Sequence, residues 1–215
     1  RFPEGCFLPS EFELSKSYGV SRITAKRALD ELAASNLAVR EQGRGTLVHN
    51  GVRKRSVEGN LKQLVAGLRS AEISHRIRLV SSSQKKASPD LAAQFDGEPN
   101  MPVCCIKRVL VGAVGPTSYV ISYLNLAAAK DWPKMVLERK PITTLIEEAG
   151  VVIIRASETV SAVGASADVA AHLGVKRNTP LLKVVRRIFD RSQCIEIVEA
   201  LHRSDRYEYR VSLGR

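Results

Sequence analysis

Residues 8–48, LPSEFELSKSYGVSRITAKRALDELAASNLAVREQGRGTLV, constrain the fold of this chain more than any other stretch. After Pro9 comes Ser10-Glu11-Phe12-Glu13, an S-x-x-E capping box in which the serine and the second glutamate satisfy each other's backbone amides at a helix start. This helix is expected to end near Tyr18, where Gly19 supplies the left-handed residue that follows many helices. The stretch therefore opens with a short helix and a tight turn.

A second helix is expected to begin at Ser21, which can cap it. Its apolar residues recur at i, i+3, i+4 and i+7 and form one stripe, made of Ala25, Ala28, Leu29 and Leu32. The opposite arc of the helix carries Arg22, Ile23, Lys26 and Arg27. A short helix, a glycine turn and a second helix with a basic face are the layout of a helix-turn-helix. A solvated basic face is the alternative that this segment alone leaves open.

Residues 37–48 are expected to form a β-hairpin. Strand character in residues 37–40 and 46–48 flanks a tip made of Gln42, Gly43, Arg44 and Gly45. The two glycines let the backbone approach a partner closely, and Arg44 stands at the apex. Such a tip suits insertion into a minor groove or contact with phosphates.

The whole stretch resembles the winged helix-turn-helix of the GntR family of bacterial transcription regulators. The shared pattern is L-P-S-E-x-E-L, then G-V-S-R-x-T-x-x-R-A-L, then L-x-x-x-x-G-x-G-T-x-V. The resemblance implies that Arg22 reads base edges and that Lys26 contacts DNA. The resemblance also implies DNA contacts by the neighbouring residues Ser21, Thr24 and Arg27, and by a wing made of Gln42, Gly43, Arg44 and Gly45. It also implies a homodimer on a palindromic double-stranded site.

The sequence departs from the family pattern in two places. Phe12 stands where the family has a basic residue, so one expected DNA contact is missing. The family also has a helix before residues 3–5, and this sequence begins after it. Leu14, Ala28 and Leu32 are then expected to lack a packing partner. Residues 1–49 are accordingly assigned to a winged helix-turn-helix without its first helix.

The charge of the chain suits a polyanionic partner but does not identify one. The net charge is +11 and the sequence pI is about 9.8. Residues 1–55 contribute +4 and residues 56–215 contribute +7, so the charge is not concentrated in the first domain. Residues 50–60, NGVRKRSVEGN, are polar with two glycines and are expected to be an interdomain linker.

Residues 61–215 form the second predicted domain, and an internal repeat dominates it. The segment ASPDLAA at residues 87–93 returns as ASADVAA at residues 165–171, an offset of 78 residues. Further matches at this offset are Asn100 with Asn178, Pro102 with Pro180 and Arg108 with Arg186. Each copy is predicted to form a serine-capped helix, a loop and a strand. The two strands span residues 103–111 and 181–189. We expect a duplicated unit that shares one antiparallel sheet.

The remaining patterns complete an α+β fold with helices packed to one side of the sheet. Further strands are expected at residues 77–80, 118–124, 195–201 and 207–213. A helix is expected over residues 141–149, stopped by Gly150. Residues 151–154 and 159–163 indicate a strand or a bent pair of strands.

This half resembles the UTRA ligand-binding domain of HutC-type GntR regulators, which has a chorismate-lyase-like fold. The landmarks are Ser122-Tyr123-Leu124, Leu173-Gly174-Val175, Glu196 and Arg203-Ser204-Asp205-Arg206-Tyr207. The resemblance implies a small anionic effector contacted by Arg108, Ser122, Tyr123, Glu196 and His202. Arg108 would be the first arginine of an R-x-R anion clamp, in which Leu110 replaces the second. Purely structural roles for Arg108 and Glu196 remain open.

These observations predict a DNA-binding transcriptional repressor whose operator binding is controlled by an effector in the second domain. The alternatives are a chorismate-lyase-like enzyme and an architectural DNA-binding protein without an effector. No G-x-S-x-G, H-E-x-x-H or glycine-rich phosphate loop is present, so we expect no enzyme, no catalytic residue and no cofactor.

Metal sites and membrane segments are not expected either. His49, His75, His172 and His202 are scattered, and the four cysteines have neither metal nor disulfide spacing, which predicts buried thiols. No run approaches the roughly 18 apolar residues of a membrane span, and no signal segment opens the chain. The default expectation is a cytoplasmic protein.

Overall fold

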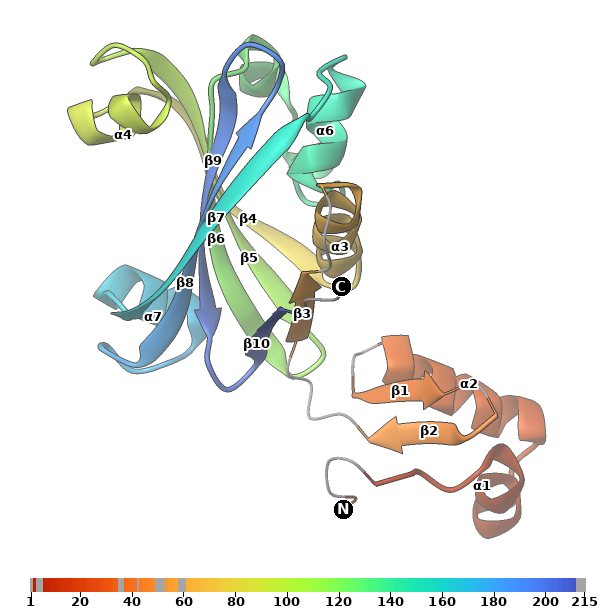
Figure 1. Cartoon of the computed structure of the whole chain (residues 1–215). Coiled ribbons are helices and arrows are strands. Elements are labelled where there is room, and N and C mark those ends of the chain that lie inside the picture. Colours follow the sequence, from red (N-terminus) through yellow and green to blue (C-terminus); the bar gives the residue numbers. More distant parts are fainter. Residues whose placement is uncertain are drawn as a thin grey trace.

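The computed structural model describes residue 2 and residues 6–34, 37–41, 43–48, 53–57 and 61–211. The predicted wing residue Gln42 and the histidine at position 49 lie outside the described residues. Two parts of the chain are described in turn, the region up to residue 48 and the sheet domain (Figure 1).

The first part has the predicted order of elements, given by α1 (Glu11–Tyr18), α2 (Arg22–Ala34), β1 (Ala38–Glu41) and β2 (Gly45–Val48). The Glu13 amide donates to Ser10 Oγ at 3.2 Å, and the Ser10 amide donates to Glu13 Oε2 at 2.7 Å. These bonds from the Ser10 backbone and side chain lower the pKa of the Glu13 carboxyl. Gly19 closes α1 at φ 63°. The capping box and the left-handed turn are both confirmed.

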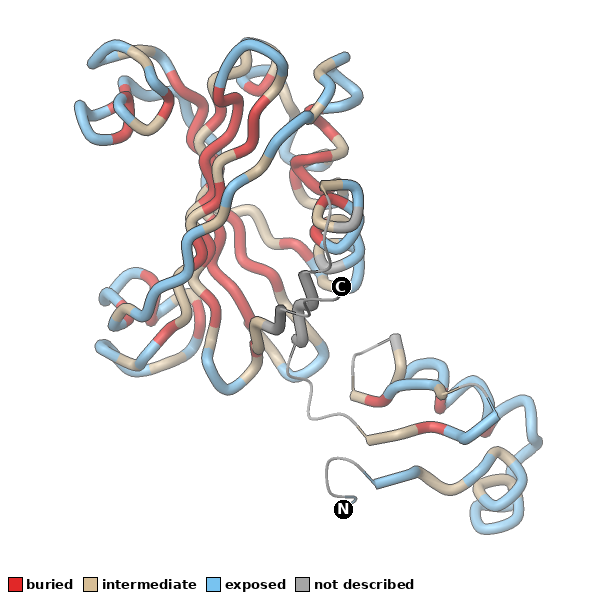
Figure 2. The backbone as a smooth tube through the Cα atoms, in the orientation of Figure 1, coloured by how far each residue is buried: buried red, intermediate tan, exposed pale blue. Residues whose placement is uncertain are grey.

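The apolar stripe of α2 is only partly covered. Ala25 and Leu29 are buried, and Ala38 of β1 is buried as well. Ala28 is exposed, and Leu32 is 36% exposed. Most of this part of the chain is exposed in Figure 2. Half of the stripe is therefore exposed in the described part of the chain.

The second part is a six-stranded antiparallel sheet with the order β4-β5-β6-β9-β8-β7. Its strands are β4 (Arg76–Lys86), β5 (Pro102–Gly112), β6 (Gly115–Leu124), β7 (Arg155–Gly164), β8 (Pro180–Phe189) and β9 (Cys194–Arg203). The central strands are buried along most of their length (Figure 2).

Helices cover both faces of this sheet, so the prediction of helices on one side was wrong. One face carries α4 (Pro89–Gln94) and α7 (Ala167–Leu173), and the other carries α3 (Leu61–Ile73) and α6 (Ile142–Glu148) (Figure 1). The short η1 (Ala127–Asp131) and α5 (Lys134–Leu137) pack on the same core as α6. The physical reason lies in the burial of β5, where consecutive residues are buried instead of every second one. Because neighbouring residues point to opposite faces, both faces of the sheet must be covered.

The internal repeat is confirmed. Ser88 and Ser166 cap α4 and α7, and each Oγ accepts from the amide three residues on at 3.3 Å. Asn100 and Asn178 both adopt left-handed φ values, 67° and 63°. The unit β4-α4-β5-β6 repeats as β7-α7-β8-β9, which gives the strand order its mirror-like symmetry about the β6–β9 pair.

Several boundaries differ from the predictions. Residues 53–57, assigned to the linker, form β3 (Arg53–Val57), which pairs in parallel with β10 (Tyr207–Val211). Residues 151–154 are not a strand, and β7 begins at Arg155. The helix α3 was not predicted. Cysteines 104, 105 and 194 are buried as expected, whereas Cys6 is exposed, because it lies beside a partly covered hairpin.

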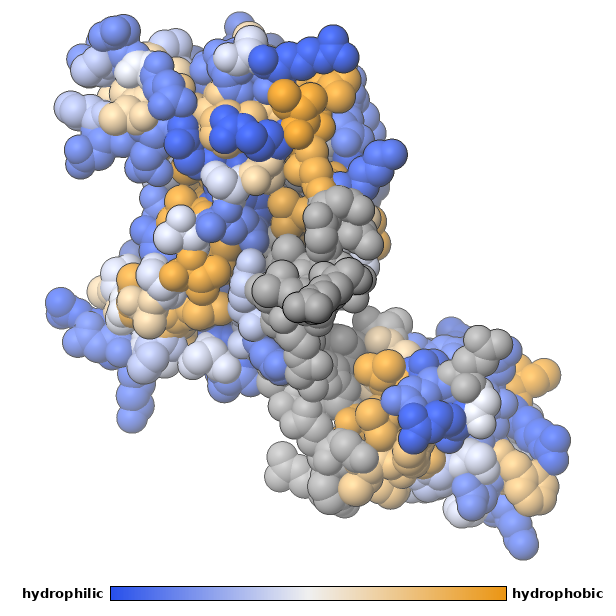
Figure 3. Space-filling view, in the orientation of Figure 1, coloured by the Kyte–Doolittle hydropathy of each residue, from blue (hydrophilic) through white to orange (hydrophobic). Residues whose placement is uncertain are grey.

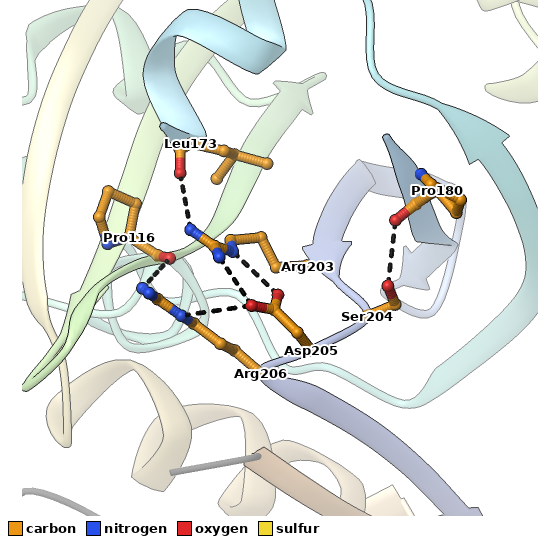
Figure 4. A network of polar contacts seen from close by, with 7 residues as sticks. All are labelled: Pro116, Leu173, Pro180, Arg203, Ser204, Asp205 and Arg206. Atoms are coloured by element: carbon orange, nitrogen blue, oxygen red, sulfur yellow. Dashed lines mark hydrogen bonds and ion pairs between the residues drawn. The ribbon is translucent and has the colours of Figure 1, made fainter. Parts of the chain in front are cut away.

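A polar network fixes the turn between β9 and β10 (Figure 4). Arg203 binds both Asp205 oxygens, at 3.0 and 2.7 Å, and donates to the carbonyl of Leu173 at 3.1 Å. Arg206 donates to the carbonyl of Pro116 at 3.0 Å. The bidentate Arg203 pair holds the pKa of the Asp205 carboxyl below its usual range. The landmark segment at residues 203–206 therefore has a structural role, tying the turn to β6 and α7.

Candidate functional site

The predicted DNA-contact residues of α2 share one exposed surface at the start of the helix. Ser21 accepts from the Thr24 amide at 3.0 Å and so caps α2. Arg22, Lys26 and Arg27 are exposed. Arg27 pairs with Glu31 at 3.3 Å on the helix surface. The helix thus presents cationic side chains around an N-terminus whose own dipole favours anions.

Phe12 contributes to this surface in an unexpected way. The Arg22 guanidinium lies 4.8 Å from the centre of the Phe12 ring, a cation–π distance. Phe12 is 57% exposed and Ile23 is 81% exposed, and hydrophobic atoms stand among hydrophilic ones on this part of the surface (Figure 3). Phe12 therefore supports Arg22 at the position where a basic residue was expected.

Arg40 braces the helix pair, a role that the sequence patterns did not reveal. Its guanidinium donates to Glu11 of α1 at 2.9 Å and to Asp30 of α2 at 2.7 Å. Arg40 itself lies on β1, so one side chain joins three elements. The bond to Glu11 is the main cause that raises the pKa of Arg40. These bonds fix the orientation of α2 relative to α1 and β1.

The wing is a tight hairpin with a basic tip. Gly43 and Gly45 have φ values of 76° and 120°, which side chains other than hydrogen rarely allow. Arg44 exposes 71% of its side chain and pairs with Glu41 at 2.9 Å. Its guanidinium also lies 5.8 Å from the Phe7 ring centre. The predicted geometry of the tip is present in these residues.

The second candidate site is a cavity between the sheet and the helices α3 and α6. Its volume is about 30 Å³. It is lined by apolar side chains from three strands and two helices and by a group of polar ones, namely Glu72, Ser122, Thr143, Arg186, Glu196 and His202. Strand register explains the grouping, because Ser122 pairs with Val198, which pairs with Arg186.

Of the five predicted effector contacts, Ser122, Glu196 and His202 line the cavity, whereas Arg108 and Tyr123 do not. Neighbouring residues of a strand point to opposite faces, so Tyr123 lies on the other side of the sheet from Ser122. There it packs against the α4 core, with Lys85 Nζ 4.5 Å from its ring centre. The prediction that Tyr123 joins this site is therefore corrected.

Glu196 is the most unusual group in the cavity. Its side chain is 1% exposed, and neither carboxylate oxygen makes a hydrogen bond within the described residues. Burial raises the pKa of Glu196 to about 7, although the adjacent Ser122 hydroxyl lowers it in part. Thr143 Oγ1 is also buried without a partner among the described residues. These groups need hydrogen-bonding partners that a polar ligand can supply.

His202 is held in place by the sheet and by β10. Its Nδ1 lies 2.7 Å from the Ser118 hydroxyl, and its ring stacks on Tyr207 with the centres 3.7 Å apart. Ser118 and Glu196 are equivalent positions at the repeat offset of 78, and so are Val120 and Val198. The repeat therefore places different polar groups, Ser118 and Glu196, at equivalent positions, and of these two Glu196 lines the cavity.

Both repeat-related arginines carry carboxylate partners. Arg108, 1% exposed, donates to Glu72 Oε2 at 2.9 Å and to the Lys140 carbonyl at 3.2 Å. Arg186 pairs with Glu158 of β7, whose other oxygen accepts from Tyr209 at 3.2 Å. Glu72, Thr143 and Glu158 were not predicted, because their sequence distance from the arginines gives no local pattern.

Other site classes find no support in the described part of the chain. Among those residues no group of three or more His, Cys, Asp or Glu side chains is placed to hold a metal ion. None of the described helices is long and apolar enough to span a bilayer.

Comparisons with known proteins divide the chain into the same two parts, the region up to residue 48 and the sheet domain. Residues 70–208 match the UTRA domain family, and residues 1–48 match the family described as bacterial regulatory proteins, gntR family. The HTH-type transcriptional regulator Rv0792c of Mycobacterium tuberculosis is 29% identical over 220 aligned positions, covering 100% of this chain and 80% of that protein. The histidine utilization repressor of Pseudomonas putida is 27% identical over 201 positions, covering 93% of this chain and 80% of that protein. The crystal structure of PhnF from Mycobacterium smegmatis has a TM-score of 0.67 at 22% identity, over 99% of this chain and 94% of that one.

Proposed function

The chain belongs to the GntR family of transcriptional repressors with a C-terminal UTRA effector-binding domain, and on this premise we propose how it works. It binds a palindromic operator as a homodimer, and a small anionic metabolite in the sheet domain controls that binding. The family consists of regulators, not enzymes. Its place of action is the cytoplasm, where its DNA partner is found.

The DNA-binding part of the proposal is carried by the exposed basic start of α2. A helix entering the major groove by its N-terminal end brings Arg22 to the base edges, where arginine pairs with guanine. Lys26 and Arg27 lie further along the same surface and suit phosphate contacts. The Arg44 tip of the wing suits the backbone or the minor groove.

Arg22→Ala is expected to weaken operator binding by about 1–3 kcal/mol, roughly fivefold to 150-fold, and to relax the preference at one base position. Arg27→Ala is the matched control, because a phosphate contact carries no sequence information. It should weaken binding to all sequences alike and reduce the salt slope by about one. Binding titrations against a set of single-base operator variants measure both effects. An Arg22→Ala protein with unchanged site preference contradicts the docking.

Phe12 provides a second check of the same surface. Phe12→Ala removes the ring that supports the Arg22 guanidinium, so operator affinity should fall by about 0.5–1 kcal/mol. The loss should vanish in an Arg22→Ala background, because the two residues act through one contact. Additive losses in the double variant would show that Phe12 acts independently of Arg22.

The effector part of the proposal is carried by two buried groups. Glu196 lines the cavity, and Arg108 is bonded to Glu72, which also lines it. Among the described residues, the buried Glu196 carboxyl has no hydrogen bond and the buried Arg108 Nε has no acceptor, and a ligand that pairs with these atoms removes their cost. Arg108 suits an anionic group, and Glu196, Thr143 and Ser122 suit hydroxyl or amino groups of the same molecule.

A thermal-shift screen of anionic metabolites tests the effector model. A metabolite at 100 times its dissociation constant should stabilise the protein by about 2.7 kcal/mol. The same compound should change operator affinity in a binding titration, by linkage. Operator affinity that no stabilising compound changes would support an architectural DNA-binding protein instead.

A further inference from the structure

Arg108 is already occupied by a carboxylate of the protein itself. Its Nη2 donates to Glu72 Oε2 at 2.9 Å, and its Nη1 donates to the Lys140 carbonyl at 3.2 Å. Glu72 lines the cavity and Arg108 does not. The Glu72 side chain is 18% exposed and that of Arg108 only 1%. Glu72 therefore stands between the guanidinium and the space that a ligand would enter.

The bond between Arg108 and Glu72 is weaker than the one a small anion can make. It uses one nitrogen and one oxygen, whereas carboxylates and phosphates can bind a guanidinium through two parallel bonds. Arg108 Nε is buried and has no acceptor among the described residues. A ligand that also satisfies this nitrogen removes the cost of an unpaired buried donor.

The cavity is too small for a metabolite in this arrangement. A volume of about 30 Å³ holds one or two water molecules, whereas ligand pockets span about 300–1,000 Å³. Most of its walls are strands hydrogen-bonded within the sheet. The wall formed by Leu68 and Glu72 belongs to α3, a single helix held to α6 partly by the surface ion pair of Arg69 with Glu147. That wall is the one that can move at the lowest cost.

We propose that Glu72 is a built-in competitor for the Arg108 site. A carboxylate or phosphate group of the effector displaces the Glu72 carboxylate, and the C-terminal turn of α3 moves away to admit the rest of the ligand. This proposal rests on the proposed function, since it takes Arg108 as the site of the effector's anionic group. Because α3 is the first helix after residues 53–57, the exchange acts on the segment that leads back to the DNA-binding part.

Anion binding to the whole chain tests the competitor role. Inorganic phosphate and acetate are titrated separately, by calorimetry and thermal unfolding, into the wild type and Glu72→Gln. If Glu72 holds Arg108 for about nine-tenths of the time, its removal should tighten binding of the accepted anion about tenfold. Glu199→Gln removes a carboxylate from the partly exposed Lys183 pair within the sheet and is the matched control, with affinity unchanged. Arg108→Lys in the Glu72→Gln background should abolish the gain.

The outcomes separate this proposal from the function on which it rests. Unchanged or weaker anion binding in Glu72→Gln, with binding still lost in Arg108→Lys, overturns the competitor role and leaves Arg108 as an anion site. Binding of neither anion to any variant overturns the competitor role and the anionic effector together. The response to phosphate against acetate distinguishes a phosphorylated effector from a carboxylate.

Two further measurements keep the proposal testable if Glu72→Gln fails to fold, since its Arg108 would be a buried charge without a carboxylate. Glu72→Asp keeps the charge but withdraws it by one methylene, and it should tighten anion binding in the same direction. Hydrogen exchange of the wild-type amides at residues 67–73 should accelerate when phosphate is added. Exchange that stays constant or slows at saturating phosphate contradicts the displacement of α3.

Discussion

Glu196→Gln should remove a loss of stability that the wild-type protein undergoes as the pH rises from about 4.5 to about 7. Burial raises the pKa of the folded-state carboxyl from 4.5 to about 7, so the folded protein holds this proton more tightly than the unfolded chain. The stability from this group is full below pH 4.5 and is lost as the pH passes through about 7. A shift of this size corresponds to roughly 3 kcal/mol.

Urea unfolding of both proteins across this pH range measures the effect. The difference in unfolding free energy between Glu196→Gln and the wild type should grow with pH, in favour of the variant, and level off above the folded-state pKa. Glu199→Gln is the matched control, because Glu199 lies on the same strand but pairs with Lys183 with 27% of its side chain exposed. Parallel pH profiles for Glu196→Gln and the wild type would falsify the assignment of a buried, unpaired carboxyl.

The buried Glu196 carboxyl also supports the proposal that the cavity is a binding site. A glutamine or leucine at this position would fold without the ionisation penalty, so the carboxyl lowers the stability of the protein when it is ionised. A ligand that donates hydrogen bonds to Glu196 recovers that cost on binding. The affinity for such a ligand should then depend on pH over the range in which the Glu196 carboxyl titrates.

The DNA-binding part could be predicted almost completely because its determinants are local. The capping box spans four residues, Gly19 follows α1 directly, and the hairpin needs only its two glycines. Arg40 escaped prediction, since its partners Glu11 and Asp30 lie 29 and 10 residues away. Its ion pairs depend on the angle between α1 and α2, which no pattern in the sequence encodes.

The sheet domain was predictable where it repeats. The offset of 78 residues identified both serine-capped helices and the two strands that carry Arg108 and Arg186. The covering of both faces was missed because no pattern in the sequence states on which side of the sheet a helix packs, and α4 and α7 pack on one face while α6 packs on the other. Tyr123 was misassigned because the strand period of two separates it from its neighbour Ser122.

The partners of the two arginines were not predictable. Glu72 reaches Arg108 across 36 residues, and Glu158 reaches Arg186 across 28. The repeat relates the arginines but not the carboxylates, since one lies on α3 and the other on β7. The protein thus neutralises equivalent charges in different ways, with one partner on a helix and one within the sheet.

This difference predicts different roles for the two ion pairs. The Arg108–Glu72 pair is expected to open for a ligand, whereas the Arg186–Glu158 pair is expected to stabilise the fold. Arg186→Met should lower the unfolding free energy by about 3–5 kcal/mol, because it removes the buried guanidinium that pairs with the Glu158 carboxylate. The two side chains are 8% and 9% exposed, so water screens the pair little. Lys183→Met on the same strand is the matched control. Its partner is Glu199 and its side chain is 28% exposed, so the loss should stay below about 1 kcal/mol.

A double variant separates the strength of the pair from the cost of breaking it. Arg186→Met with Glu158→Leu removes both charges and should recover most of the stability lost in Arg186→Met, because apolar replacements of buried ion pairs are often neutral. Urea unfolding of the four proteins gives the coupling energy between the two sites. If Arg186→Met lowers stability no more than Lys183→Met does, the Arg186 pair is solvent-screened. Such a result would contradict the structural role of the Arg186 pair.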